Sequence, residues 1–496
     1  MTVSVPTSRW ATAALLLAFA IAVRACDFGN PVIHVDEQYY LLVGDRMLHG
    51  AWPYIDVWDR KPIGLFALFA AIRLLPGDGI LAYQLVATLF VAATAWLVHR
   101  AARQVGAAQA GAWFAAAACV IWPSLLSGRG GQSPIFYGLF VCAAALLTLR
   151  LPVLAARIDR RGIVLSGMAT CFLAGLAIQT KYTAAVEGAF FGIVHLFYLR
   201  RAGAHWPTIF ATATGWLVIG LAPTLIAIGV YAAHGPAALR AFWFANFESI
   251  FLRSHYTYPA RLIAERLLGI VAQLSPLAIG AGVAMRRRGR NEAHSIAVGW
   301  LIAAFVGFAV LGTYFDHYAL PLIAPLAVVA APAFGRHRRL ALVALALALA
   351  TMVVKQALRH DDRAGAYALA QVVAANSGEE CPYIFAGDAI TYHLAHVCLP
   401  TAYAFPSTLA YAPEQGATGI NEAGEVARIL ARRPPVIVMG DRPLAAWNEA
   451  SHAEVVAALA RDYRPVFSVP REDYRLVAYL RRDRAFKTTG RMSAER

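Results

Sequence analysis

Long stretches of the chain contain no Asp, Glu, Lys or Arg: residues 79–98, 104–128, 130–149, 207–233 and 267–285. About 20 consecutive apolar residues span a bilayer as a helix. Hydrocarbon offers the backbone no hydrogen bonds, so segments of this kind must be helices. The chain is 59% hydrophobic and 15% charged, whereas soluble domains carry about 25% charged residues. These stretches predict a polytopic α-helical membrane protein.

Arginine clusters in short loops fix the expected topology: 100–103, 157–161, 200–201, 286–290 and 336–339. Such loops stay in the cytoplasm, so the net charge of +15 does not indicate nucleic-acid binding. About eleven spans fit this pattern, near 6–25, 79–99, 108–127, 133–151, 162–180, 183–199, 207–233, 264–285, 295–313, 318–335 and 339–356. The loop 26–78 and all residues after Lys355 then lie outside. Segment 62–75 is too short to span and predicts a juxtamembrane or re-entrant helix.

The sequence changes character near residue 359. Residues 1–358 form the predicted transmembrane module, and 359–484 read as an extracytoplasmic α/β domain with strands near 383–387, 436–440 and 474–480. Cys381 and Cys398 could pair in an oxidising compartment. The tail 485–496 is predicted to be disordered.

Polar chemistry concentrates in the first outer loop, 26–78. It contains carboxylates, a cationic pair and aromatic side chains close to a membrane entry point, in the order His34, Asp36, Glu37, Tyr39, Tyr54, Asp56, Asp59, Arg60 and Lys61. A solvated loop would also show this composition. Its Tyr and Trp residues, however, suit an interfacial belt that holds charges at headgroup depth.

This loop resembles the GT-C glycosyltransferases, through Asp36-Glu37 after the first span and Pro53-Tyr54-x-Asp56-x-x-Asp59-x-Lys61-Pro62. The resemblance is strongest to protein O-mannosyltransferases and lipid A aminoarabinose and galacturonic acid transferases. It continues through Gly175-Leu176-x-x-Gln179-Thr180-Lys181-Tyr182-Thr183 and Gly312-Thr313-Tyr314-Phe315-Asp316-His317-Tyr318, and so covers roughly residues 10–335.

The resemblance implies a cell-envelope enzyme of the bacterial inner membrane whose active site and C-terminal domain are periplasmic. It would move a hexosyl or pentosyl group from a polyprenyl-phosphate donor to a lipid (such as lipopolysaccharide), glycan or protein acceptor, with inversion. The reaction needs a carboxylate to remove the acceptor proton and positive charge to stabilise the departing phosphate. Asp36 is the expected base, and Glu37 is expected to orient the acceptor or its neighbours. The expected phosphate contacts are Arg60, Lys61 and Lys181.

Other residues are weaker candidates. His34 and Asp36 could hold a divalent metal ion, as some relatives do, although two ligands two residues apart are a weak signal. Substrate contacts are expected from His34, Tyr39, Tyr54, Asp56, Asp59, Arg253, His255, His317 and Tyr318. The alternative to an enzyme is a polytopic transporter or flippase for a lipid-linked or anionic substrate. Transporters show internal repeats and midplane charges, which this sequence lacks.

Overall fold

Every predicted span coincides with a helix in the computed structural model, which describes residues 8–253, 256–286 and 291–488. The spans are α1 (Arg9–Arg24), α4 (Ile80–Gln104), α5 (Gln109–Leu125), α6 (Ser133–Thr148), α8 (Arg160–Ile178), α9 (Ala184–Arg201), α10 (Trp206–His234), α13 (Ala260–Met285), α14 (Glu292–Ala309), α15 (Leu320–Arg336) and α16 (Arg338–Leu358). Short helices η1 (Ala25–Asp27), α7 (Leu151–Ala156) and η3 (Asp316–Ala319) join them. The start of the first predicted span and residues 287–290 of an arginine cluster lie outside the described residues.

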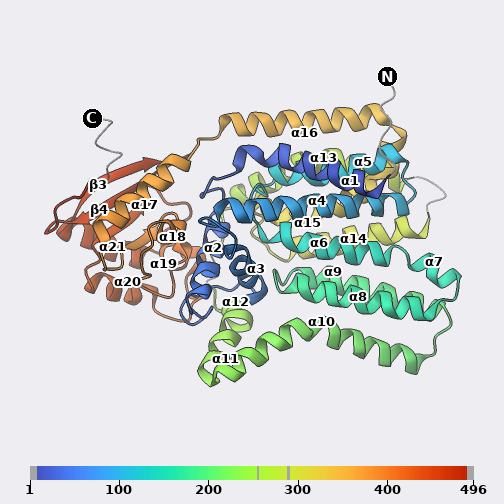
Figure 1. Ribbon diagram of the computed structural model, residues 1–496, viewed down its shortest axis with the longest axis horizontal. Helices are drawn as coiled ribbons and strands as arrows, with labels where there is room; N and C mark the ends of the chain where they lie inside the picture. Colours follow the sequence, from blue (N-terminus) through green and yellow to red (C-terminus); the bar gives the residue numbers. More distant parts are fainter. Residues whose placement is uncertain (1–7, 254–255, 287–290, 489–496) are drawn as a thin grey trace. The chain divides into compact units, whose positions relative to one another are not determined.

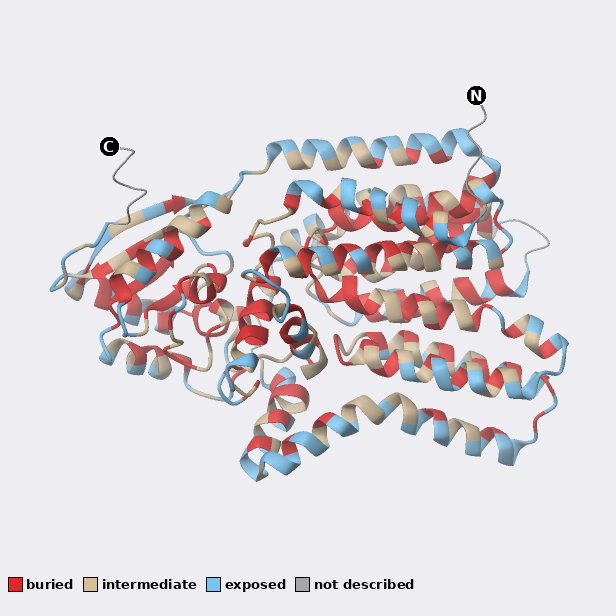
Figure 2. Cartoon of the chain, in the orientation of Figure 1, coloured by how far each residue is buried: buried red, intermediate tan, exposed pale blue. Residues whose placement is uncertain are grey.

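Nine of the described helices are long and apolar enough to cross a membrane. Of the other two predicted spans, α5 is apolar but has 17 residues, and α9 carries Glu187, Arg200 and Arg201. Many large apolar side chains on the helices are exposed, as α16 shows with Leu340, Leu342, Val343, Leu347 and Val353 (Figure 2). Apolar side chains facing outward are expected of helices whose solvent is lipid. The polytopic helical membrane fold is thus confirmed.

The chain divides into two compact units. The first contains residues 1–28, 84–227 and 258–358, and its long helices run side by side as a bundle (Figure 1). The second contains residues 29–83, 228–257 and 359–496. Residues 29–78 of the loop 26–78 therefore belong to the same unit as the C-terminal region.

Two helices of the second unit come from the first outer loop: α2 (Val35–Leu48) and α3 (Ile63–Arg73). They pack closely at Gly44, where an added Cβ would lie 2.6 Å from the backbone nitrogen of Ala70. Only a glycine permits this approach. The helix α3 has 11 residues, too few to cross a bilayer, and it lies within the segment 62–75 that was expected to form a short, non-spanning helix.

The C-terminal region of this unit contains a four-stranded sheet of order β1-β2-β4-β3. Its strands are β1 (Tyr383–Ala386), β2 (Val436–Gly440), β3 (Tyr463–Pro470) and β4 (Arg475–Arg481). Strands β1 and β2 are parallel, and the other pairs are antiparallel. The helices of the region are α17 (Arg363–Ser377), α18 (Ile390–Leu394), α19 (Pro406–Ala410), η4 (Ala412–Glu414), α20 (Glu422–Ala431) and α21 (Glu449–Asp462).

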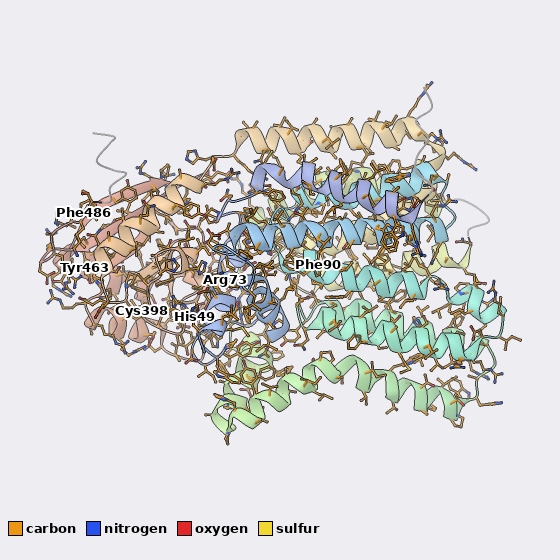
Figure 3. The ribbon with its side chains drawn as sticks, viewed as in Figure 1. His49, Arg73, Phe90, Cys398, Tyr463 and Phe486 are labelled. Atoms are coloured by element: carbon orange, nitrogen blue, oxygen red, sulfur yellow. A yellow bond between two sulfur atoms is a disulfide. The ribbon has the colours of Figure 1, made fainter. Side chains whose placement is uncertain are left out.

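Strand β3 was not predicted. It lies at the edge of the sheet, contains Pro465 and Pro470, and is bulged between Pro465 and Phe467. Proline cannot donate to the ladder and is confined to edges and bulges, so the segment lacks the apolar pattern of a central strand. Cys381 and Cys398 are joined by a disulfide, with Cα atoms 5.0 Å apart. Figure 3 labels Cys398 in the C-terminal region.

The first outer loop is anchored to the C-terminal region by polar contacts. The Gln38 side chain donates to the Asp388 carboxylate (3.4 Å), and the Trp58 backbone N–H donates to the Ala402 carbonyl (2.8 Å). Asp388 also pairs with the buried Arg471, at 2.6 Å. These contacts fix α2 within its unit.

Three short helices of the second unit follow α10: α11 (Pro236–Trp243), a π-helical turn, η2 (Phe244–Glu248), and α12 (Ser249–Leu252). The Phe244 ring lies close to Gly419 of the C-terminal region: a Cβ added at Gly419 would lie 2.7 Å from the ring.

Candidate active site

The sequence at residues 34–50 specifies where α2 begins and ends. His34 is the N-cap, and its Nδ1 accepts a hydrogen bond from the Asp36 backbone N–H at 3.3 Å. Asp36 and Glu37 lie in the first turn, where negative charge is favoured by the helix dipole. Gly50, at φ +89°, closes the other end. The cap is thus His34, and the Asp36 carboxylate is not needed for that role.

Asp36 lies beside Lys61, which precedes α3. The Lys61 ammonium is 3.9 Å from Asp36 Oδ1 and 5.6 Å from the centre of the Tyr40 ring. Both side chains are partly accessible: 17% of Asp36 and 28% of Lys61 are exposed. A carboxylate and a cation that substrate can reach therefore meet at the start of α2.

Tyr40 forms the wall behind this pair. It lies one helical turn after Asp36, on the same face of α2, and is buried against Phe66 and Phe69. Burial, followed by the nearby Asp36 carboxylate, raises the pKa of Tyr40 well above its ordinary value. The Tyr40 hydroxyl therefore keeps its proton and adds no charge to the pair.

Glu37 is fully buried, with 0% of its surface exposed. A carboxylate enclosed in this way can act on a substrate only through its neighbours.

Two buried tyrosines hold the segment that carries the cations. The Tyr39 hydroxyl donates to the Trp58 carbonyl (2.8 Å), and the Tyr54 hydroxyl donates to the Lys61 carbonyl (2.7 Å). Tyr54 has a φ of +70°, an uncommon conformation that the surrounding contacts must hold. Lys61 is thus positioned through its own backbone.

The two aspartates of this segment bond to backbone N–H groups. Asp56 accepts from Trp52 (2.7 Å), and Asp59 accepts from Arg60 (2.6 Å). Both bonds are local and shape the turn.

The neighbouring cation, Arg60, faces a different carboxylate. Its guanidinium pairs with Glu414, which also pairs with Arg253 at 3.1 Å. Arg60 and Lys61, expected to contact one phosphate, therefore point to different partners. His255 lies outside the described residues.

The remaining candidates belong to the first unit. Lys181, between α8 and α9, lies with its ammonium 4.5 Å from the centre of the Tyr318 ring. His317 is buried beside Tyr318, with ring centres 4.5 Å apart. Their turn is fixed by Asp316, which accepts from the Ser127 hydroxyl at 2.7 Å. The structure thus brings Lys181, His317 and Tyr318 together.

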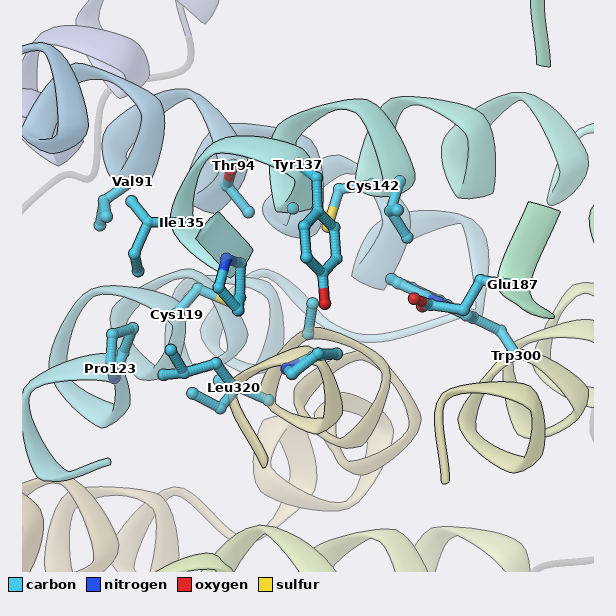
Figure 4. A pocket seen from close by; sticks show the side chains of 16 residues that line it. Val91, Thr94, Cys119, Pro123, Ile135, Tyr137, Cys142, Glu187, Trp300 and Leu320 are labelled. Atoms are coloured by element: carbon cyan, nitrogen blue, oxygen red, sulfur yellow. The ribbon is translucent and has the colours of Figure 1, made fainter. Parts of the chain in front are cut away.

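A cavity of about 50 Å³ opens among α4, α5, α6, α9, α14 and α15 of the same unit (Figure 4). Its wall is apolar except for a few groups, including the Tyr137 hydroxyl and the Glu187 carboxyl. Glu187 accepts a hydrogen bond from the Trp300 indole at 2.7 Å. This intramembrane carboxyl is therefore paired within the bundle.

Two site residues were missed from the sequence. Tyr40 follows Asp36 by four positions, and this helical spacing could have identified it. Glu414 gives no such signal, because its partner Arg60 is 354 positions away in the chain.

No protein-family model and no curated protein matches the chain. Solved structures do match. The apo form of ArnT from Cupriavidus metallidurans is similar with TM-score 0.64 and 15% identity, over 94% of this chain and 97% of that chain. The form of ArnT from Cupriavidus metallidurans bound to undecaprenyl phosphate is similar with TM-score 0.63 and 15% identity, over 95% of this chain and 98% of that chain.

The archaeal oligosaccharyltransferase AglB from Archaeoglobus fulgidus, in complex with an inhibitory peptide and a dolichol-phosphate, gives TM-score 0.51 and 13% identity. That match covers 87% of this chain and 69% of AglB. The chain therefore has the fold of these proteins, and the GT-C-like fold expected from the motifs is confirmed.

Proposed function

We propose that the protein is an integral membrane glycosyltransferase that moves a hexosyl or pentosyl group from a polyprenyl-phosphate donor to a lipid, glycan or protein acceptor. The observation that carries this proposal is the accessible Asp36–Lys61 pair at the start of α2. A base and a cation are the two groups that the reaction needs. The fold adds support, because ArnT is solved with undecaprenyl phosphate and AglB with a dolichol-phosphate. Neither likeness favours a transporter or flippase.

The reaction follows from the placement of these groups. Asp36 takes the proton of the acceptor hydroxyl as its oxygen attacks the anomeric carbon of the donor sugar. The bond from that carbon to the phosphate oxygen breaks, and polyprenyl phosphate leaves with the electron pair. Lys61 stabilises the negative charge that develops on the leaving group. Attack opposite to the leaving group inverts the anomeric carbon.

The surrounding residues hold this geometry. Tyr39 and Tyr54 fix the backbone that carries Lys61. Buried Glu37 is proposed to orient the acceptor or its neighbours. Lys181 and Tyr318, held together in the first unit, are proposed to contact the donor, with His317 beside them.

A divalent ion is proposed as an optional cofactor. His34 and Asp36 would hold it, since an imidazole nitrogen and a carboxylate are suitable donors for zinc or manganese. His34 Nδ1 accepts from a backbone N–H, so Nε2 is the atom that would bind the ion. Bound there, the ion would supply positive charge. Treatment with EDTA followed by metal analysis of wild-type and His34→Ala protein tests this assignment.

The outer face of the bacterial inner membrane is the proposed location of the site and the C-terminal domain. The arginine-rich loops support it through the positive-inside rule. The Cys381–Cys398 disulfide supports it too, because disulfides persist mainly in oxidising compartments.

The direct test is to incubate purified protein in lipid nanodiscs with a polyprenyl-phosphate-linked sugar and measure free polyprenyl phosphate. Release that increases when an acceptor extract is added supports a transferase. Movement of the intact donor across liposomes without any release would contradict it.

A further inference from the structure

Arg60, Arg253 and Glu414 come from three separate segments of the second unit and meet at one point. Arg60 precedes α3, Arg253 follows α12, and Glu414 ends η4. Glu414 pairs with both guanidinium groups, and Arg253 Nη2 lies 3.1 Å from Glu414 Oε1. The Arg253 Nε also donates to the Pro413 carbonyl at 2.6 Å.

The turn that carries Glu414 is held firmly. Tyr411 forms a β-bridge with Trp447, and the Ala412 N–H donates to the Ala446 carbonyl at 2.8 Å. Pro413 is buried. The Glu414 carboxylate is thus presented to the arginines from a fixed backbone, and its own side chain is the part that can move.

Charge and burial distinguish this cluster from an ordinary surface ion pair. Two guanidinium groups face one carboxylate, and the three side chains are 22%, 25% and 19% exposed for Arg60, Arg253 and Glu414. Within the described residues, Arg60 Nη1 is buried without a hydrogen-bond partner. The site therefore has more positive charge and more donors than one carboxylate uses.

A phosphate monoester suits these surplus donors better than a carboxylate. It carries a charge of about −1.5 to −2 and three acceptor oxygens, and arginines bind phosphate through parallel hydrogen bonds. The cluster is separate from the proposed catalytic pair, because Lys61 faces Asp36 and Tyr40.

We propose that Arg60 and Arg253 form a binding site for a phosphate monoester, which Glu414 occupies until that phosphate displaces it. This inference rests on the proposed function only for the identity of the molecule that carries the phosphate. That molecule is either the polyprenyl phosphate released in the reaction or an acceptor that bears a phosphate of its own. Glu414 is then an internal competitor that keeps the arginines paired while no substrate is bound.

The test compares full-length wild-type, Glu414→Gln and Glu380→Gln proteins in nanodiscs. Glu380 is a matched control, since it also pairs with two arginines, Arg481 and Arg484, in the C-terminal region. Binding is measured by calorimetry with inorganic phosphate, undecaprenyl phosphate and, as a blank, undecaprenol. We expect Glu414→Gln to bind inorganic phosphate roughly tenfold more tightly than wild type, and Glu380→Gln to match wild type. Arg60→Gln should weaken the binding by a similar factor.

The two probes separate the sources of the phosphate. If Glu414→Gln also binds undecaprenyl phosphate more tightly than wild type, the lipid carrier uses the site. If only the binding of inorganic phosphate becomes tighter, the phosphate belongs to an acceptor. Equal binding of undecaprenyl phosphate and undecaprenol by wild type would contradict the proposed function, while the inorganic-phosphate series would still decide the arginine site. Should Glu414→Gln fold poorly, Glu414→Asp retains the charge on a shorter arm and should give an intermediate gain. Unchanged phosphate affinity in the Glu414 and Arg60 variants overturns the proposal.

Discussion

Lys61 Nζ lies 3.9 Å from Asp36 Oδ1, although one residue precedes α3 and the other belongs to the first turn of α2. This contact depends on the close packing of α2 against α3 at Gly44 and on the Tyr54 hydroxyl, which donates to the Lys61 carbonyl at 2.7 Å. In the proposed reaction the two groups act on different substrates: the Asp36 carboxylate acts on the acceptor and the Lys61 ammonium acts on the donor phosphate. Substitutions that affect one group should therefore be separable from those that affect the other.

Lys61→Ala should chiefly weaken use of the lipid donor. A hydrogen bond to a charged group contributes about 1.5–3 kcal/mol, so the KM for donor or the Kd for undecaprenyl phosphate should rise roughly 10- to 150-fold. Binding measurements on purified protein check this, with Lys487→Ala, an exposed lysine near the C-terminus, as control. Unchanged donor kinetics in Lys61→Ala would remove the residue from the proposed site.

Gly44→Ala should disturb the same pair without touching it. The new Cβ would meet the backbone of Phe69 and Ala70 at 2.6–2.7 Å, so α2 and α3 must separate. Overpacking of this kind destabilises by about 1–3 kcal/mol, which a thermal melt of the purified protein detects, and turnover should fall with it. Gly138→Ala in α6, where nothing lies within 4 Å of the new Cβ, is the control. Identical melting of the two variants would show that this packing is not tight.

The spans were predictable because a segment that crosses the hydrocarbon of a bilayer must be apolar along its whole length and must form a helix. Apolar length alone located helices such as α10 and α13 to within a few residues. Strand β3 was not predicted because Pro465 and Pro470 interrupt the apolar pattern that marks a strand. An edge strand also needs little alternation of apolar and polar residues. The π-helical turn at Phe244–Glu248 was not predicted either. Phe244 lies close to Gly419, and no local sequence pattern reveals a contact between residues so far apart in the chain.

The candidate site was predictable as a region but not as a set of pairs. The motif placed Asp36 and Lys61 in one loop, and the structure brings them together. It could not show that Arg60 and Lys61, adjacent in sequence, face different carboxylates. That separation depends on Glu414, whose distance along the chain from Arg60 leaves no trace in local composition.

The disulfide should stabilise the C-terminal region. Cys381 and Cys398 close a loop with a sequence separation of 17, and closing a loop of about 15 residues stabilises by about 3 kcal/mol in the chain-entropy model. The double variant Cys381→Ser, Cys398→Ser should therefore be cleaved faster in limited proteolysis of this region. Cys26→Ser, which replaces an exposed cysteine outside this disulfide, is the control. Equal cleavage rates would indicate that the bond contributes nothing.

The topology can be read with single cysteines in a Cys26→Ser background. A cysteine at Ala485, which is exposed, should react with a membrane-impermeant maleimide in intact spheroplasts. A cysteine at Ala156, exposed at the end of α7, should react only after lysis, because its loop carries the arginines expected in the cytoplasm. The reverse pattern would move Asp36 to the cytoplasm and contradict the proposed location of the site.

The central claim, that Asp36 is the base, is tested most directly by the turnover of purified Asp36→Asn protein. Asparagine keeps the size of the side chain but cannot take the acceptor proton, and general-base catalysis contributes about 10²–10⁴-fold. Because His34 caps α2, the substitution should leave folding intact. We predict that turnover falls by that factor while undecaprenyl phosphate still binds, and that Glu37→Gln loses less. Wild-type turnover in Asp36→Asn would contradict the account.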